Sequence, residues 1–518
     1  MLIKTIVIDN LISMKKPLLF VFPIAVLATV AITTGSCDFI IIHYGSTSYE
    51  PVSPLQPNEG DGYETVHDFS FNIQDVKATT KQIALPSTGE SSILIVPVQF
   101  QGSEEWTTTK LDIVNKAFFG EAGDTAWQSV SSFYKAASYG KLTISGEISP
   151  VFKMNVTAEE AAKHMSGDTH APDEVVTKAF IADSDYYSLR KKYDKNGDGY
   201  VDSIVFVYSD HIDNTNGFWA WVYWNQDEAK NVNRPALNSY LWMSYDFFTN
   251  SKYAGYGAGI DAHTAIHETG HLLGLDDYYN YDENSKFDPS GALEMQSFNI
   301  GDQNIYSKFA LGWVNPYYVK TESSVSLKLR SSALYGDAII INDEWNKNSM
   351  DEYLILEYYT PEGMNWKDSV YTYKPNGSKA NKMYTDYGFR IYHVDSRIAE
   401  VEIRGQFKQY VDTLGRGTYV VGASNSKSRS YLPKEFADEY KYLHLLEASG
   451  KNSFKTGNIA SNATLFKKGV SFVASTEFFV NVDGETGESL FNAGNEVGYR
   501  IEITDCTSEY GAVTITKI

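Results

Sequence analysis

The stretch AIHETGHLLGLDDYY, from Ala265 to Tyr279, constrains this chain most, because it can arrange several metal ligands on one helix. His267 and His271 are four residues apart and lie on the same helix face, so their imidazole nitrogens can reach one ion. Glu268 is rotated by about 100° from the first histidine. Its carboxylate is therefore expected beside the ion, where it can accept a proton from an activated water. The stretch predicts a helix that carries two metal ligands and a general base.

The residues after this helix predict a turn and a third ligand. Gly274 has no Cβ, so the chain can bend sharply and fold back toward the histidines. Asp277 is expected to complete a zinc set of two histidines and one carboxylate, which leaves the fourth position to water. Asp276 is the competing third ligand. His263, one turn before the first histidine, is expected beside the site rather than on the ion. The alternative is a polar helix that carries its histidines by chance.

The acidic segment DKNGDGYVD, residues 194–202, is a second candidate metal site. It offers oxygen ligands at the spacing of the first part of an EF-hand loop, namely Asp194, Asn196, Asp198, the carbonyl of Tyr200, and Asp202. Position twelve holds Val205 in place of the usual bidentate glutamate, and a strand-like run follows. We expect a structural calcium loop that lacks this last ligand. The alternative is an Asx-rich turn without an ion.

The N-terminus has the pattern of a bacterial export signal. Lys15 and Lys16 precede an apolar run over Pro17–Thr33, and small residues follow just before Cys37. Residues 1–37 are therefore predicted to form a lipoprotein-type signal, in which cleavage just before Cys37 leaves this cysteine to carry a lipid that binds the membrane. The protein is then expected in the cell envelope. The alternative is a plain secretory signal and a secreted protein.

The rest of the chain predicts two folded regions after a less regular segment. Residues 38–90 are polar and weakly patterned, which is typical of a linker or pro-segment. Residues 91–317 alternate between strand-like and helix-like runs and predict an α+β domain. Residues 318–518 contain short alternating apolar runs between turn residues, which favours an all-β, sandwich-like domain. The formal charge of -21 disfavours a nucleic-acid partner, because phosphate backbones attract an excess of Lys and Arg.

Four stretches in this order carry a family resemblance: SVSSFYKAASYGKLTISG (Ser129–Gly146), DKNGDGYVDSIVFVY, HETGHLLGLDDYY, and LEMQSFN followed by YSKFALGWV. Together they resemble the secreted zinc metallopeptidases typified by immune inhibitor A. Two later strand-like runs, EYLILEYYTPEG and GFRIYHVD, are similar to strands that follow the peptidase in that family. The likeness covers roughly residues 91–400.

The resemblance implies a zincin or metzincin-like peptidase domain. It implies zinc on His267, His271 and Asp277, with Glu268 as the catalytic base. Met295 would belong to the methionine turn that forms an apolar floor under the metal. The resemblance transfers no residue that stabilises the transition state, so Tyr306 and His263 are candidates only.

The expected function is that of an exported zinc endopeptidase that acts on a protein or peptide substrate. In this mechanism Glu268 takes a proton from an activated water and passes it to the leaving amine. The rival hypothesis is a catalytically inactive cell-surface binding protein that uses its β-rich domain to hold a partner. A metal-dependent hydrolase of another bond, such as an amide or an ester, is a third possibility.

Overall fold

The computed structural model describes residues 60–67, 72–79, 84–163, 171–212, 217–224, 230–249, 259–280, 285–370, 372, 384–397, 400–403, 406–409, 441–474 and 491–518. The predicted signal peptide and Cys37 lie outside this part of the chain. The described residues from 60 onward belong to one compact unit, Ser53–Ile518. No helix in the described ranges is both long and apolar enough to cross a bilayer.

A mixed sheet organises the first half of the described chain. Its strands are β2 (Gly89–Gln99), β3 (Leu142–Ile148), β4 (Phe152–Lys153), β6 (Ile204–Tyr208), β7 (Trp221–Trp224) and β9 (Ser239–Ser244). The order is β3-β2-β6-β9-β7, with β4 paired to β2 as well. All these pairings are parallel except that of β7 with β9. Among the described strands, β7 is the last in this order and forms one edge of the sheet.

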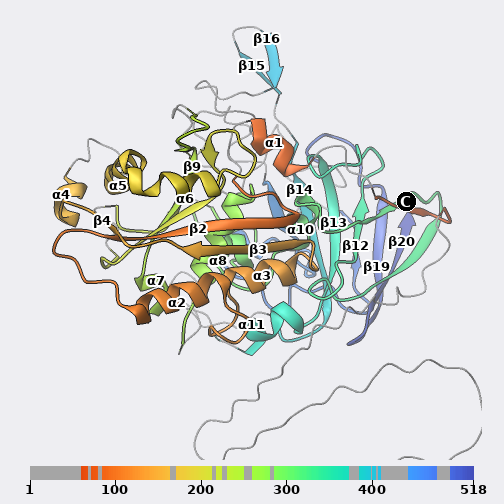
Figure 1. The fold of residues 1–518 in the computed structure, drawn as a ribbon. Coiled ribbons are helices and arrows are strands. Elements are labelled where there is room, and N and C mark those ends of the chain that lie inside the picture. The colour runs from red at the N-terminus through yellow and green to blue at the C-terminus, as the bar shows by residue number, and fades with distance from the viewer. Residues whose placement is uncertain are drawn as a thin grey trace, which may run out of the picture. The chain divides into compact units, whose positions relative to one another are not determined.

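Helices cover both faces of this sheet, because its central strands are apolar on both sides. Figure 1 shows α2 (Thr108–Phe119) and α3 (Val130–Ala137) along one side of the strands, and α5 (Ala171–Ala182) and α6 (Tyr187–Lys192) along the other. Alternate residues of β2 divide between the two cores: Ile93 and Ile95 pack on the side of α2 and α3, whereas Leu94 and Val96 pack on the side of α5. The helix α8 (His263–Leu272) lies in the first of these cores.

The second half of the described chain is rich in strands. One sheet has the order β1-β10-β12-β13-β14-β17 and the other the order β11-β20-β19-β18. The strands of the first are β1 (Tyr63–Thr65), β10 (Tyr317–Val319), β12 (Ala338–Ile341), β13 (Glu352–Tyr359), β14 (Gly388–Asp395) and β17 (Leu443–Leu445). Those of the second are β11 (Ser324–Leu329), β18 (Ser471–Phe472), β19 (Tyr499–Cys506) and β20 (Gly511–Lys517). Apolar side chains of both sheets share one buried core, which includes Ile339 and Leu356 from one sheet and Ile501 and Ile515 from the other.

The remaining elements are short. Two small sheets pair β5 (Tyr200–Val201) with β8 (Ala236–Leu237) and β15 (Glu400–Ile403) with β16 (Gln406–Gln409). The short helices are α4 (Ala158–Ala162), η1 (Ser184–Tyr186), α7 (Asp246–Thr249), α9 (Met295–Phe298), α10 (Ile305–Ala310), η2 (Gly363–Asn365), α11 (Trp366–Val370) and η5 (Ser453–Thr456). The fold is thus a mixed α/β structure with a strand-rich C-terminal part.

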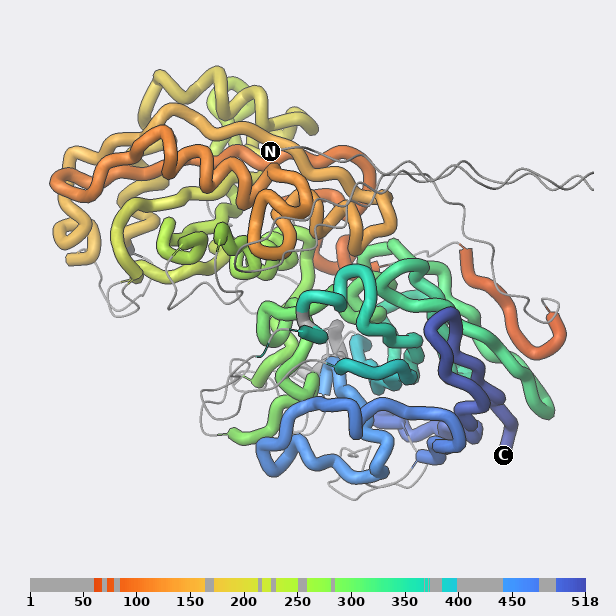
Figure 2. The backbone as a smooth tube through the Cα atoms, turned by 90° about the horizontal axis from the view of Figure 1, so that it is seen from below, coloured from red at the N-terminus to blue at the C-terminus, as the bar shows by residue number. Residues whose placement is uncertain are grey.

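The segment before β2 is folded where the structure describes it. Strand β1 pairs antiparallel with β10, more than 250 residues later, and Figure 2 shows this red segment beside the green C-terminal strands. Helix α1 (Ile73–Thr79) follows it and buries Ile73 and Val76. The range 38–90, predicted as a linker or pro-segment, therefore contributes a strand to one part of the fold and a helix to another.

A buried ion pair links α10 to both halves of the chain. The Lys308 ammonium lies 2.5 Å from the Asp302 carboxylate, and the two side chains are 1% and 2% exposed. The same ammonium donates to the Tyr139 hydroxyl, next to α3, and to the Ser332 carbonyl, in the turn after β11. It also lies over the Tyr139 ring. Every proton of this buried cation is thus directed at an acceptor or an aromatic face.

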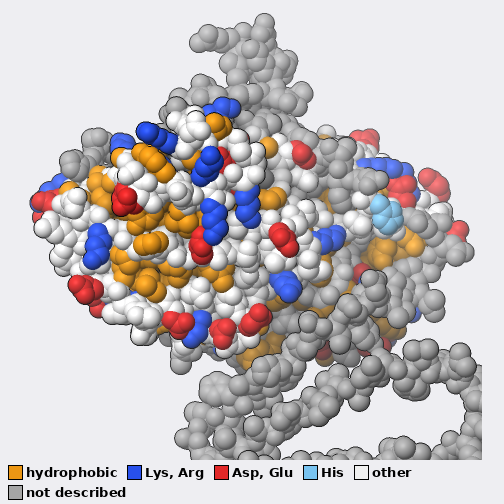
Figure 3. All heavy atoms as spheres, in the orientation of Figure 1, with side chains coloured by type: hydrophobic (Ala, Val, Ile, Leu, Met, Phe, Trp, Pro, Cys, Tyr) orange, Lys and Arg blue, Asp and Glu red, His pale blue; other side chains and the backbone are white. Residues whose placement is uncertain are grey.

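Acidic and basic side chains are interspersed on the face drawn in Figure 3, where Lys and Arg lie among Asp and Glu over α2 and α3. The described residues on this face therefore form no continuous basic surface.

Candidate metal centre

Helix α8 presents one buried histidine, His267, and one that is partly exposed, His271. His267 is 5% exposed and Glu268 is 7% exposed, and most of the helix is buried in the core that it shares with α3. The Nδ1 atom of His267 lies 2.8 Å from the Met295 carbonyl, and the Nδ1 atom of His271 lies 2.8 Å from the Leu275 carbonyl. Because a carbonyl oxygen can only accept, each Nδ1 carries the proton. Both Nε2 atoms are thereby turned toward the site as acceptors.

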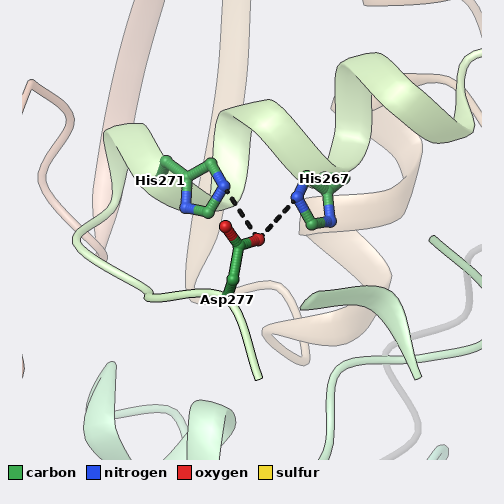
Figure 4. A group of neighbouring side chains, drawn as sticks. All are labelled: His267, His271 and Asp277. Atoms are coloured by element: carbon green, nitrogen blue, oxygen red, sulfur yellow. Dashed lines mark ion pairs between the residues drawn. The ribbon is translucent and has the colours of Figure 1, made fainter. Parts of the chain in front are cut away.

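The loop after the helix returns Asp277 to these nitrogens. The helix ends at Leu272, and Gly274 adopts a φ of +97°, a conformation that residues with a Cβ rarely take. The Asp277 Oδ1 atom lies 3.0 Å from His267 Nε2 and 3.3 Å from His271 Nε2. Figure 4 shows the carboxylate below the helix, between the two imidazoles. One ligand atom from each of the three residues lies within 4.8 Å of the others.

The electrostatics of this group require a positive charge at its centre. Burial disfavours the charged form of His271, but the Asp277 carboxylate outweighs that effect and raises the pKa of His271 to about 10. Burial would also raise the pKa of Asp277, yet the two imidazoles hold it well below its usual range. A divalent cation can be bound by all three ligand atoms at once, so the residues fit a zinc ion.

Glu268 lies beside this group and is poised as a base. Burial raises the pKa of its carboxyl, an effect that His271 and His267 oppose. A carboxylate whose pKa lies above its usual value is better matched to proton transfer near neutral pH.

A second layer of contacts orients the metal helix. Met295 is fully buried and reaches the site through its backbone carbonyl, which accepts from His267. The next side chain, Gln296, donates to the His267 carbonyl and packs against Gly270, where an added Cβ would lie 2.7 Å from Gln296 Cδ. The backbone before Met295 is strained, since Glu294 has a φ of +98°. The sequence predicts that Met295 forms an apolar floor under the metal. In the structure, its contact with the site is the hydrogen bond that its carbonyl accepts from His267.

A cavity of about 340 Å³ opens over the metal group. Its walls include Trp221, Val222 and Trp224 of the edge strand β7, together with Lys77 and Tyr279. Tyr279 belongs to the stretch Ala265–Tyr279 that carries the metal motif. The other four residues lie in elements that are distant in sequence, so the motif could not assign them to the cavity.

The other candidates from the sequence lie differently. Asp276 lines the same cavity but binds Lys77, with 2.6 Å between Lys77 Nζ and Asp276 Oδ1. His263 Nδ1 lies 2.7 Å from the Asp261 carboxylate, and Tyr306 is fully buried with its hydroxyl 2.5 Å from that of Tyr442. His263 and Tyr306 do not line the described cavity.

The side chains of the acidic loop at residues 194–202 form hydrogen bonds with backbone amides of the same loop. Its side-chain oxygens accept from nearby backbone amides: Asp194 from Gly199, Asn196 from Asp198, Asp198 from Tyr200, and Asp202 from Lys195. The pKa of Asp202 is raised mainly by burial, and the nearby Asp194 and Asp198 carboxylates raise it further. In the described part of the chain, the ligand atoms of His267, His271 and Asp277 converge closely enough to hold a metal ion, and those of the acidic loop do not. Calcium binding by the loop stays a prediction.

Comparisons with known proteins add little to this picture. No protein-family model and no curated protein matches the chain. Among solved structures, metalloproteinase-II from Bacteroides fragilis aligns at 10% sequence identity over 40% of this chain, with a TM-score of 0.21. The chain covers about half of that protein, 53% of its length. A TM-score this low does not establish a shared fold, so the immune inhibitor A-like family assignment stays an interpretation of the motifs.

Proposed function

We propose that this protein is an exported zinc endopeptidase with a metzincin-like catalytic domain. The observation that carries the proposal is the convergence of His267 Nε2, His271 Nε2 and Asp277 Oδ1 in the lining of one cavity, which Glu268 lines as well. Export and membrane attachment through a lipid on Cys37 form part of the proposal and rest on the N-terminal sequence pattern.

The two histidines and Asp277 would hold the zinc ion, which when bound supplies a Lewis acid that polarises a peptide carbonyl and makes water a better nucleophile. The chain keeps these ligands oriented before the ion arrives, because both Nδ1–H groups donate to backbone carbonyls. Since the ligands are fixed by the fold, little conformational entropy is lost on binding.

Glu268 would act as the general base and then as the general acid. Its carboxylate would accept a proton from the attacking water and return it to the amine nitrogen of the leaving group.

The edge strand β7 would align the substrate. It is antiparallel to β9 and lines the cavity with Trp221, Val222 and Trp224. An extended peptide can add to such an edge through backbone hydrogen bonds, and the aromatic walls would then contact its side chains. This geometry favours hydrolysis of a peptide within an extended chain.

The test is digestion of a denatured protein and of a quenched fluorescent peptide library by the purified chain. We expect hydrolysis that a zinc chelator abolishes and added zinc restores. The substitution Glu268→Gln should leave bound zinc unchanged and lower kcat by about 10²- to 10⁴-fold. Zinc-loaded wild-type protein that cleaves neither substrate would refute the proposal, and so would Glu268→Gln with wild-type activity.

A further inference from the structure

We propose that Lys77 is a positioning residue of the metal site, so that helix α1 is an integral part of that site and not a removable pro-segment. The inference rests on the proposed zinc binding by His267, His271 and Asp277. It assigns a role to a segment whose sequence pattern is that of a linker, and it concerns metal affinity rather than the chemical step.

Helix α1 is fixed to the end of the metal helix by side chains of two kinds. Ile73 and Val76 are 0% and 2% exposed and belong to the same apolar core as the metal helix. Gln74 donates from Nε2 to the carbonyl of Leu273, the residue that caps α8, and to the carbonyl of Leu85. The helix is therefore packed and hydrogen-bonded at the point where the metal helix ends.

The chain after α1 completes the same helix end. The backbone amides of Ala84 and Leu85 both donate to the Leu272 carbonyl, at 2.9 and 3.0 Å. The last carbonyls of a helix have no partner within it, and burying them without one is costly. Loss of residues 72–85 would leave the Leu272 and Leu273 carbonyls without these donors.

Lys77 acts on the loop that delivers the third ligand. Its alkyl stem lies over Gly274, because a Cβ built on that glycine would be 3.2 Å from Lys77 Cγ. Its ammonium binds the Asp276 carboxylate at 2.6 Å, and the two side chains are only 16% and 18% exposed. On the inner side, the Leu275 carbonyl is held by His271. The four-residue loop is thus clamped from both sides.

This clamp decides which of two adjacent aspartates faces the metal. The Asp276 carboxylate is held by Lys77, whereas the neighbouring Asp277 carboxylate lies against the histidines. Without the ammonium, Asp276 would be a partly buried carboxylate next to Asp277 and Glu268. Their mutual repulsion would move the loop and misplace the ligand. Outer contacts of this kind typically change metal affinity by about 10- to 100-fold.

The experiment measures the zinc dissociation constant of the full chain by competition with a chromophoric chelator. We expect Lys77→Met to weaken zinc binding by about 10- to 100-fold and Lys77→Arg, which keeps the charge, to recover most of it. The matched control is Lys110→Met, because Lys110 forms a 2.7 Å pair with Glu104, is 14% exposed, and lies outside the cavity. That control should bind zinc like the wild type.

Asp276→Asn tests the same pair from the other side and leaves α1 intact. We expect it to weaken zinc binding less than Lys77→Met does, because the clamp is lost but no unpaired carboxylate remains, and we expect the double variant with Lys77→Met to bind zinc like Asp276→Asn. If Lys77→Met binds zinc as tightly as the control does, the inference is overturned. If Lys77→Met fails to fold, Asp276→Asn with wild-type zinc affinity overturns it instead. Wild-type protein that binds zinc but cleaves no peptide would refute the proposed function and leave this inference standing.

Discussion

The substitution Lys308→Met tests how the two halves of the chain are held together. It removes a cation that is 1% exposed and leaves the Asp302 carboxylate, 2% exposed, buried without its counter-ion. Removing one partner of such a pair costs about 3–5 kcal/mol of unfolding free energy. Burial raises the pKa of Asp302, and Lys308 opposes that rise.

The size of the effect on thermal stability follows from the length of the folded unit, Ser53–Ile518. An unfolding entropy of about 2.1 cal/mol/K per residue means that each kcal/mol shifts Tm by roughly 1 °C in a unit of this length. We therefore expect Lys308→Met to lower Tm by about 3–5 °C in differential scanning calorimetry.

Two controls make this prediction specific to the buried charge. Lys116→Met removes an exposed partner of Asp112 and should leave Tm unchanged, because solvent screens that pair. Adding Asp302→Asn to Lys308→Met should restore part of the lost stability, since no lone charge then remains. A Tm for Lys308→Met within 1 °C of the wild type, or a double variant with the full loss, would show that the pair does not act as described.

Three further predictions concern the site and its surroundings. Gly270→Ala adds a Cβ that would lie 2.7 Å from Gln296 Cδ. The resulting overpacking should cost about 1–3 kcal/mol of unfolding free energy, which exceeds the gain of about 1 kcal/mol from the better helix propensity of alanine. We therefore expect a lower Tm and weaker zinc binding. Burial raises the pKa of Glu294 from 4.5 to about 8. The contribution of its protonated carboxyl to stability is therefore complete below pH 4.5 and is lost as the pH rises through 8. Between pH 5 and 9, Tm should fall less steeply in Glu294→Gln than in the wild type. Excess zinc should raise the Tm of the wild type but not that of His271→Ala, because an ion stabilises the folded state only if it binds there and the variant lacks one ligand. Equal Tm shifts in the two proteins would contradict zinc binding at this site.

The metal helix was the part of the structure that the sequence could predict best. His267, His271 and Asp277 meet as expected, because a helical spacing of four and a glycine turn depend on local geometry alone. The strand-rich character of residues after about 318 was also visible, since alternation with a period of two is a local pattern.

The remaining parts of the site depend on distant contacts that no local pattern contains. Lys77 reaches the cavity because α1 packs on the end of α8, almost 200 residues later. The walls formed by Trp221 and Trp224 exist because β7 runs antiparallel at the sheet edge. The strand β1 has only three residues, too few for a recognisable pattern. It is a strand because it pairs with β10. Tertiary structure determines such elements more than propensity does.

Metal analysis of the purified chain tests the central claim most directly. After dialysis against metal-free buffer, the wild-type protein should retain about one zinc ion per chain, and Asp277→Asn should retain far less while keeping the same circular dichroism spectrum. A folded wild-type protein that takes up no zinc, even from an excess, would contradict the account, and so would a variant without the Asp277 carboxylate that binds zinc as tightly as the wild type.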